Sequence, residues 1–138
     1  MSKFNFNALA RKLRSQYPAI LEKMANNAVN HFKVDNFDAE AFIDEVPERW
    51  APRKSKRDNA GRRLLVKTGR GRAGIKVLSR TGNSVKIGTL VPYMKYHNEG
   101  TARLPKRQFI GDSGVLQRKN GKVLNDAIDK TIKSYGGR

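Results

Sequence analysis

Hydrophobic side chains recur every three or four positions near the start of the chain, with polar residues between them. This spacing places the apolar residues on one stripe of a helix, so residues 4–33 are predicted to be helical. Because a proline removes a hydrogen bond from a helix interior, we expect a break at residues 15–18, with a second helix beginning there and Ser15 as its candidate cap. The predicted stripe consists of Leu9, Leu13, Ile20, Leu21, Met24, Ala28 and Phe32.

The same spacing returns at the end of the chain and predicts an amphipathic helix over residues 122–135, ended by Gly136 and Gly137. Residues 111–121 lack this periodicity and read as a loop. The apolar face of the predicted helix consists of Val123, Leu124, Ala127, Ile128, Thr131, Ile132 and Tyr135.

Between the helical regions, apolar and polar residues alternate over residues 73–90, which predicts a β-hairpin around Thr81-Gly82-Asn83. A three-residue loop pairs Val77 with Ile87 and Ser79 with Val85. A slip of one residue would turn lysines toward the core, so we expect this register. The apolar face of the hairpin would then hold Ile75, Val77, Val85, Ile87 and Thr89.

Aromatic residues interrupt the polar region 34–52. Phe37, Phe42 and Trp50 are separated by acidic residues and prolines, a pattern typical of a loop pinned to a core. The acidic residues are too scattered for a calcium-binding loop, which also needs a central glycine. Two interpretations stay open: an acidic loop that meets a basic neighbouring subunit, or an exposed connector.

Residues 91–113 combine turn formers with aromatic rings and show no periodicity. This composition predicts an ordered loop, because a floppy linker would not carry buried rings. Tyr93 and Tyr96 are three positions apart and share one face of a short helical turn. His97 is expected to donate a hydrogen bond that fixes the loop, with the two tyrosines packed beside it.

The second half of this segment contains the signals of a sharp turn. Gly100 supplies the conformational freedom for the turn, and Pro105 fixes the direction in which the chain leaves it. Residues 107–110 then read as a short strand or edge segment that returns Phe109 and Ile110 to the core.

Together these patterns predict a single α+β domain of 138 residues. N-terminal helices and a C-terminal helix would pack on a small twisted antiparallel sheet that contains the hairpin at about 73–90. In chain order the expected regions are a helical part at 1–33, a loop-rich part at 34–72 with a mobile basic segment at 53–63, a sheet and motif loop at 73–113, and the helix at 122–135.

Composition narrows the class of protein. Hydrophobic residues make up 38% of the chain and the mean hydropathy is −0.69, so we expect some segments to become ordered only on assembly. No apolar run approaches the roughly 20 residues that span a bilayer, and the first residues lack a signal-peptide pattern. The chain has no cysteine, which excludes disulfides and thiolate metal sites. We expect a protein that is intracellular when made.

Positive charge is concentrated after the first third of the chain. Residues 1–50 hold seven basic and seven acidic side chains, so the whole net charge of +17 falls in residues 51–138. A field of this strength indicates an acidic partner, either phosphate or an acidic protein surface, although a merely solubilising surface is the alternative. The candidate contacts are Arg53, Lys54, Lys56, Arg57, Arg62, Arg63, Arg70, Arg72, Arg103 and Lys106.

Short motifs of nucleotide binding and catalysis fail in context. Gly69, Gly71 and Gly74 match G-x-G-x-x-G, but a strand-like pattern follows where a nucleotide site requires a helix. His97 and Glu99 spell H-x-E without the cysteines of a zinc deaminase. No G-x-S-x-G elbow frames the serine of residues 112–113 for a triad with the histidine. We therefore expect no catalytic site, cofactor, metal or small-molecule substrate.

The motifs from residue 50 onward, taken in order, resemble those of the phage virion morphogenesis family, the Mu-like tail completion protein S group and its head–tail joining relatives. Within that pattern Arg70-Gly71-Arg72 is a departure, because the family has an apolar residue there. The residues that carry the resemblance are Trp50, Leu64, Leu65, Thr68, Gly69, Tyr93, Tyr96, His97, Gly100, Thr101, Pro105, Arg107, Phe109, Ile110, Gly111 and Ser113.

This resemblance implies a structural virion protein of head–tail joining or tail completion, made in the bacterial host cytoplasm. Its partners would be other phage head–tail or tail proteins, further copies of itself in a ring, and packaged DNA through non-specific contacts, with no membrane. We expect the acidic loop 35–48 to meet the basic loops flanking Gly61 and Gly100. The alternative is a free, non-specific nucleic-acid-binding protein, for which the charge asymmetry is the whole argument.

Overall fold

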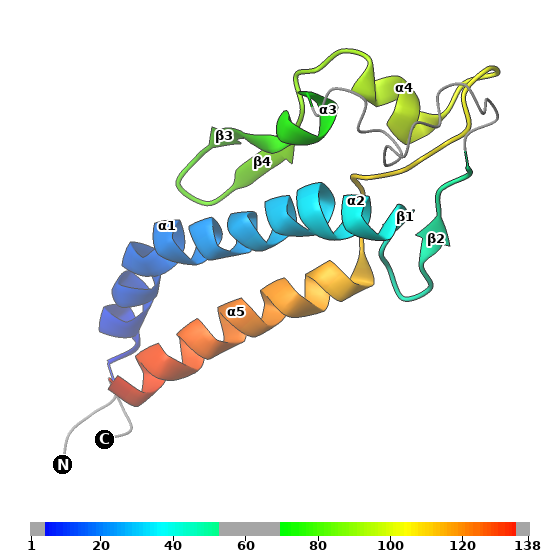
Figure 1. Cartoon of the computed structure of the whole chain (residues 1–138). Coiled ribbons are helices and arrows are strands. Elements are labelled where there is room, and N and C mark those ends of the chain that lie inside the picture. The colour runs from blue at the N-terminus through cyan, green and yellow to red at the C-terminus, as the bar shows by residue number, and fades with distance from the viewer. Residues whose placement is uncertain (1–4, 53–69, 135–138) are drawn as a thin grey trace.

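The computed structural model describes residues 5–52 and 70–134 of the chain. Two long helices, α1 (Phe6–Asn30) and α5 (Gly114–Ile132), lie side by side, and a β-hairpin lies against the other side of α1 (Figure 1). The hairpin consists of β3 (Lys76–Arg80) and β4 (Val85–Gly88). This arrangement is an α+β fold, as the sequence predicts.

Helix α1 continues through Pro18, so the predicted break into two helices is wrong. Asn5 caps the helix, because its side chain accepts a hydrogen bond from the Ala8 amide at 3.0 Å. Ser15 is not a cap: its hydroxyl donates to the Lys12 carbonyl at 2.6 Å. The proline bends the helix instead of ending it, and the axis changes direction in the N-terminal part of α1 (Figure 1).

Helical structure extends past the predicted end at residue 33. Helix α1 runs directly into a π-helical turn, η1 (His31–Asp35), and then into α2 (Asn36–Ala39). The left-handed conformation of Glu40, with φ of 51°, ends this run. Packing against the core therefore maintains the helix where the local sequence reads as a loop.

The region 34–52 is pinned to the core as predicted, since the three aromatic side chains Phe37, Phe42 and Trp50 are buried. The prediction that it is only a loop is wrong, because β1 (Ala41–Phe42) pairs antiparallel with β2 (Glu48–Arg49). Within residues 5–52 and 70–134 the fold thus has two separate two-stranded sheets instead of one. Strand β1 is buried and β2 is exposed, so the pair holds Phe42 in the core and leaves Glu48 and Arg49 on the surface.

The register of the second hairpin is half right. Val77 lies opposite Ile87 as predicted, but Ser79 lies opposite Lys86 and not Val85, because a bulge interrupts the ladder between Val77 and Ser79. The loop is therefore one residue longer than expected, and the Thr81 amide closes it by donating to the Ser84 carbonyl at 2.9 Å. Ile75 is buried, whereas Val77, Val85 and Ile87 are only partly buried.

The segment 107–110 is not a strand, although it brings Phe109 into the core as predicted. The side chain of Asn98 takes the place of a partner strand. Its Oδ1 accepts hydrogen bonds from the amides of Phe109 at 2.9 Å and Ile110 at 3.0 Å. Asn98 lies in the short helix α4 (Met94–Glu99), which agrees with the predicted helical turn.

Helix α5 begins at Gly114, well before the predicted start at residue 122. The reason is Ser113, whose hydroxyl accepts a hydrogen bond from the Leu116 amide at 3.3 Å and caps the helix. Gly121, taken as part of a loop, lies inside the helix. Tyr135 and the two glycines expected to end the helix lie outside the described residues.

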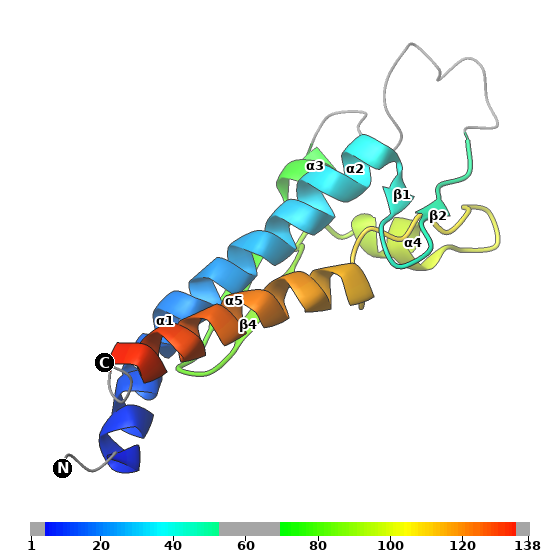
Figure 2. The ribbon, with the colours of Figure 1, turned by 90° about the horizontal axis from the view of Figure 1, so that it is seen from below.

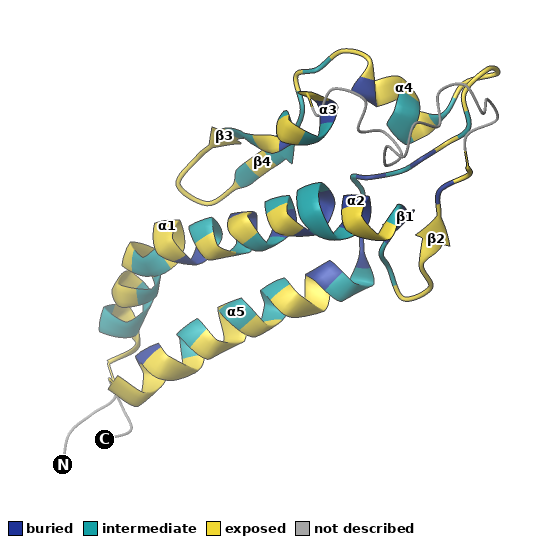
Figure 3. Ribbon diagram, viewed as in Figure 1, coloured by how far each residue is buried: buried dark blue, intermediate teal, exposed yellow. Residues whose placement is uncertain are grey.

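The hydrophobic core lies at one end of the helix pair, around α2 and the end of α1 (Figure 3). The other halves of α1 and α5 are mostly exposed or partly buried. None of the helices in the described ranges has an apolar stretch long enough to cross a membrane. The buried core consists of Ala28, Phe32, Phe37, Phe42, Trp50, Ile75, Met94, Phe109 and Leu116.

Candidate functional site

A buried asparagine joins three distant segments at the core end of the molecule. Asn36 is fully buried in α2. Its Nδ2 donates to the Phe109 carbonyl at 2.9 Å, and its Oδ1 accepts from the Ile43 amide at 2.9 Å. Sequence reasoning missed this residue, because an Asn in a polar stretch has no local signature of burial.

The motif residue Trp50 ties the strand β2 side of the core to the segment 105–113. Its indole Nε1 donates to the Gln108 carbonyl at 2.8 Å. Its ring packs edge-on against Phe37, with the centroids 5.2 Å apart. The tryptophan is therefore a buried anchor of the core.

The motif residue Arg107 is a second tie and is only 8% exposed. Its Nε donates to the Ala51 carbonyl at 2.9 Å, and its Nη2 donates to the Pro52 carbonyl at 3.3 Å. A buried guanidinium is tolerated where such carbonyl oxygens accept its hydrogen bonds. Arg107 thus fixes the backbone immediately before the basic run that begins at residue 53.

The chain resumes after residue 69 at the short helix α3 (Arg70–Ala73), which is also anchored. Arg72 was expected to contact an acidic partner. Its Nε instead donates to the Lys33 carbonyl at 2.7 Å, its Nη2 pairs with Asp38 at 2.9 Å, and its guanidinium lies 5.5 Å from the centroid of the Phe37 ring. Arg72 is therefore a positioning residue within the fold.

Close packing holds α3 on α4. A Cβ at Gly71 would lie 2.4 Å from Sδ of the buried Met94, so a larger residue here would require the methionine side chain to move. The apolar contact at this point of the chain thus comes from a methionine that packs on a glycine backbone. We call the Asn36, Trp50, Arg72 and Arg107 contacts the polar framework; it fixes the chain on both sides of residues 53–69.

His97 does not make the hydrogen bond expected of its side chain. Its Nδ1 is buried and has no partner in the described part of the chain, while its backbone carbonyl accepts from the Arg107 amide at 2.8 Å. Burial, followed by the positive charge of Arg107, lowers the pKa of His97 below its ordinary value. The imidazole is therefore neutral at neutral pH, with the ring of Tyr93 edge-on at 6.3 Å.

The predicted turn at Gly100 is confirmed. Its φ is +79°, and an added Cβ would lie 3.0 Å from the backbone nitrogen of Lys106. Thr101 completes the turn by accepting hydrogen bonds from the amides of Arg103 and Leu104 through its hydroxyl. Gly111 and Pro105 lie partly buried on either side of the buried Phe109.

We expected the rings of this segment to be buried, but its two tyrosines are exposed. Tyr93 is 41% and Tyr96 is 54% exposed, and the neighbouring basic side chains of Lys95, Arg103 and Lys106 are exposed as well. A surface on which aromatic rings lie near positive charges is suited to contact an acidic partner. Arg70 is exposed too, whereas Thr68, Gly69 and the candidates Arg53, Lys54, Lys56, Arg57, Arg62 and Arg63 lie outside the described residues.

Two residues of the acidic loop are used inside the chain. Asp44 accepts a hydrogen bond from the Gly114 amide at 2.8 Å, and Glu45 forms an ion pair with Arg118. Hydrogen bonds from the amides of Gly114 and Glu45 lower the pKa of Asp44. These carboxylates therefore stabilise the start of α5, and the partner contact expected of the loop stays a prediction.

The hydroxyl of Ser113 is also engaged. It donates to the Ile43 carbonyl at 2.9 Å and caps α5. Nε2 of His31 lies 3.0 Å from the same carbonyl. These contacts give Ser113 a structural role and offer no nucleophile–base pair. Groups of three or more acidic or histidine side chains able to hold a metal ion do not occur within residues 5–52 and 70–134.

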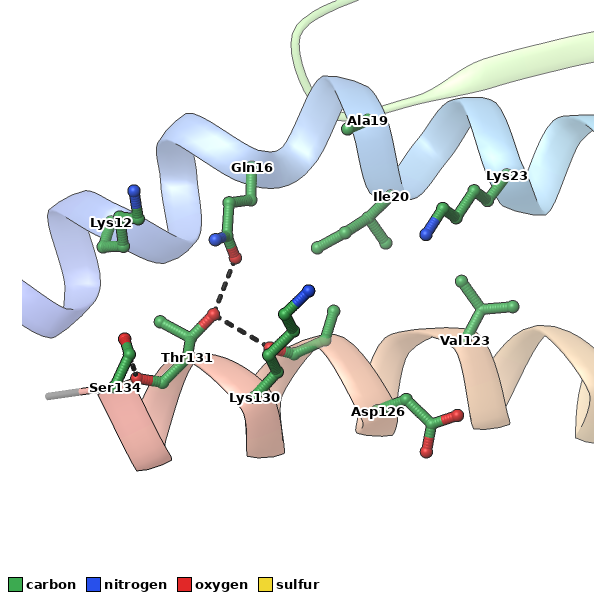
Figure 4. A pocket seen from close by; sticks show the side chains of 11 residues that line it. Lys12, Gln16, Ala19, Ile20, Lys23, Val123, Asp126, Lys130, Thr131 and Ser134 are labelled. Carbon is green, nitrogen blue, oxygen red and sulfur yellow. Dashed lines mark hydrogen bonds between the residues drawn. The ribbon is translucent and has the colours of Figure 1, made fainter. Parts of the chain in front are cut away.

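A groove of about 540 Å³ runs between the N-terminal half of α1 and the C-terminal half of α5 (Figure 4). Its floor is apolar, and Lys23 from α1 and Lys130 from α5 project into the space between the helices. Thr131 Oγ1 lies 2.7 Å from Gln16 Oε1 and joins the two walls. The lining residues are Lys12, Gln16, Ala19, Ile20, Lys23, Val123, Asp126, Ala127, Lys130, Thr131 and Ser134.

The sequence does not reveal this groove, because the apolar stripe of a helix does not indicate whether its contact with another helix is tight or loose.

Comparison of the chain with protein families, with curated proteins and with solved structures gives no match.

Proposed function

We propose that this chain is a structural protein of tailed-phage assembly that acts in head–tail joining or tail completion. The proposal rests on the ordered motifs between Trp50 and Ser113, which resemble the virion morphogenesis family. In this role the protein acts by architecture: copies pack around an axis, and their basic surfaces face DNA or acidic rims of neighbouring rings.

The observation that carries the proposal is the polar framework. Trp50 and Arg107 are far apart in the sequence, yet their side chains bond to each other's segments. These contacts give two of the motif residues a structural role, which an architectural function requires. The scaffold also sets the positions of Pro52 and Arg70, between which the chain carries its densest run of positive charge.

A second candidate function is free, non-specific nucleic-acid binding, supported by the excess of positive charge in residues 51–138. The exposed tyrosines of the segment 91–113 favour it further, because bases stack on such rings. The two functions differ in what loss of the protein does to particle assembly.

The test is inactivation of the gene in a phage or prophage that carries it. We expect the cells to accumulate full heads and separate tails, visible by negative-stain electron microscopy, and purified wild-type particles to contain the protein. Supply of the wild-type chain from a plasmid should restore joined particles. Normal particle numbers without the protein, or particles that lack it, would contradict the proposal and favour the nucleic-acid-binding alternative.

A further inference from the structure

The groove between α1 and α5 has unpaired positive charge above an apolar floor. Lys23 and Lys130 come from opposite walls, and neither makes an ion pair with another described residue. The acidic residue in the lining, Asp126, is engaged by Lys122 at 3.0 Å. A group that enters this groove with an apolar tip and a carboxylate would satisfy both features.

The connection between β1 and β2 presents such a group. Val46 at its tip is 81% exposed, the most exposed of the large hydrophobic residues in the described chain. Glu48 follows it closely and is exposed, with no ion pair to another described residue. Pro47 between them restricts the backbone. The loop therefore presents a valine beside a free carboxylate.

The loop and the groove cannot meet within one molecule. Figures 1 and 2 place β1 and β2 at one end of the α1/α5 pair, while the groove residues lie toward the other end. We propose that the loop 43–48 of one copy docks in the α1/α5 groove of a second copy. Val46 covers the floor at Ile20 and Val123, and Glu48 pairs with Lys23 and Lys130.

This contact is heterologous, because it joins two different surfaces, and repeated copies close into a ring or extend into a filament. The inference rests on the proposed architectural function and names the self-contact that builds the assembly. It differs from the expected contact between the acidic loop and the loops flanking Gly61 and Gly100, because it uses Val46 and Glu48 instead of Asp44 and Glu45, which contact α5 within the chain.

Cysteine pairing tests the contact directly, because the natural chain has no cysteine. One protein carries Val46→Cys and a second carries Val123→Cys; the two are mixed at high concentration and oxidised. We expect a disulfide-linked heterodimer to form at least about tenfold faster than in a control mixture of Val46→Cys and Lys119→Cys, because docking brings the two thiols together. Lys119 is exposed on α5 and lies outside the groove lining. Equal rates in both mixtures would overturn the proposal.

Charge reversal provides the second arm. Adding Glu48→Lys to the Val46→Cys protein, or Lys23→Glu with Lys130→Glu to the Val123→Cys protein, should each reduce cross-linking to the control rate. Mixing the two reversed proteins should restore it, because the charges again match. Glu99→Lys, at an exposed site on α4, is the matched control for the loop and should leave cross-linking unchanged. Circular dichroism checks that every variant is folded, and folded reversed proteins that fail to restore cross-linking when mixed would contradict the Glu48–lysine pairing.

The result separates this inference from the proposed function. A protein that is present in particles and required for joining, but shows no Val46–Val123 cross-link in solution or in particles, retains the function and loses the contact. A protein that cross-links specifically but is dispensable for joining retains the contact and loses the function.

Discussion

The substitution Asn36→Ala is the sharpest probe of the polar framework. Asn36 is fully buried and satisfies the Phe109 carbonyl and the Ile43 amide, each at 2.9 Å. Alanine leaves both backbone groups buried without a partner. An unsatisfied buried polar group costs about 1–3 kcal/mol, so with two such groups the free energy of unfolding should fall by about 2–6 kcal/mol.

Urea denaturation measured by tryptophan fluorescence is a suitable assay. The chain has a single tryptophan, Trp50, which is buried against Phe37 and reports on the framework itself. The matched control is Asn125→Ala, at an exposed position of α5, where the change should be within about 0.5 kcal/mol. An Asn36→Ala protein with the wild-type midpoint and slope would refute the assignment of these two hydrogen bonds to the stability of the fold.

Asn36→Asp extends the argument to pH. A carboxylate can accept from Ile43 but cannot donate to Phe109, and its charge is buried. Burial therefore raises the pKa of the introduced Asp in the folded state above its unfolded value of about 3.9. The protonated form fits, so relative to the wild type the variant should gain stability as the pH falls and lose it as the pH rises through the folded pKa.

Three further predictions follow from packing, capping and charge. Gly71→Ala should destabilise the fold by about 1–3 kcal/mol, because the added Cβ would overlap Met94, whereas Gly121→Ala, with open space around it in α5, should stabilise the fold by about 0.5–1 kcal/mol. Thermal unfolding compares the two variants, and an unchanged stability of Gly71→Ala would show that the contact with Met94 is loose. Asp44 has a lowered pKa in the folded state, so the stability that it contributes is present above its unfolded pKa and is lost as the pH falls through its folded pKa. The wild type should therefore lose more stability than Asp44→Asn on acidification. Parallel profiles of stability against pH would contradict the stabilising hydrogen bond from the Gly114 amide to Asp44. Arg103→Ala with Lys106→Ala should weaken DNA binding equally for all sequences and lower the slope of log affinity against log salt by about 2. Lys119→Ala with Lys133→Ala removes the same charge from other exposed positions and should change this slope less. A larger change of slope for the second pair would place the DNA contact on α5.

Local periodicity was enough to predict the parts of the fold in which each residue is placed by its near neighbours. The apolar stripe of α1 and the turn at Gly100 are of this kind, whereas the bulge between Val77 and Ser79 shifts the hairpin away from its predicted register. The extension of α1 into α2 could not be predicted from a polar sequence, because Asn36 and Phe37 become buried only when the segment around Phe109 reaches them.

The candidate site likewise contains some residues that the sequence singles out and others that it does not. Trp50, Arg107 and Ser113 stand out in the sequence as motif residues, and their contacts explain why these residue types occur. The sequence predicts that the segment 107–110 pairs with another strand. Asn98 could not be recognised, because its side chain takes the place of that partner strand. The groove depends on how far apart α1 and α5 lie, which no single helix pattern encodes.

The central claim is that the protein works by becoming part of the particle, and an extract complementation experiment tests it most directly. Extract from cells infected with phage that lack the protein would receive increasing amounts of the purified chain, and infectious particles would be counted. An architectural role predicts that infectivity rises in proportion to added protein and saturates at a fixed number of copies per particle, with those copies recovered in purified particles. Full restoration by far fewer copies than particles, with none of the protein retained, would contradict the account.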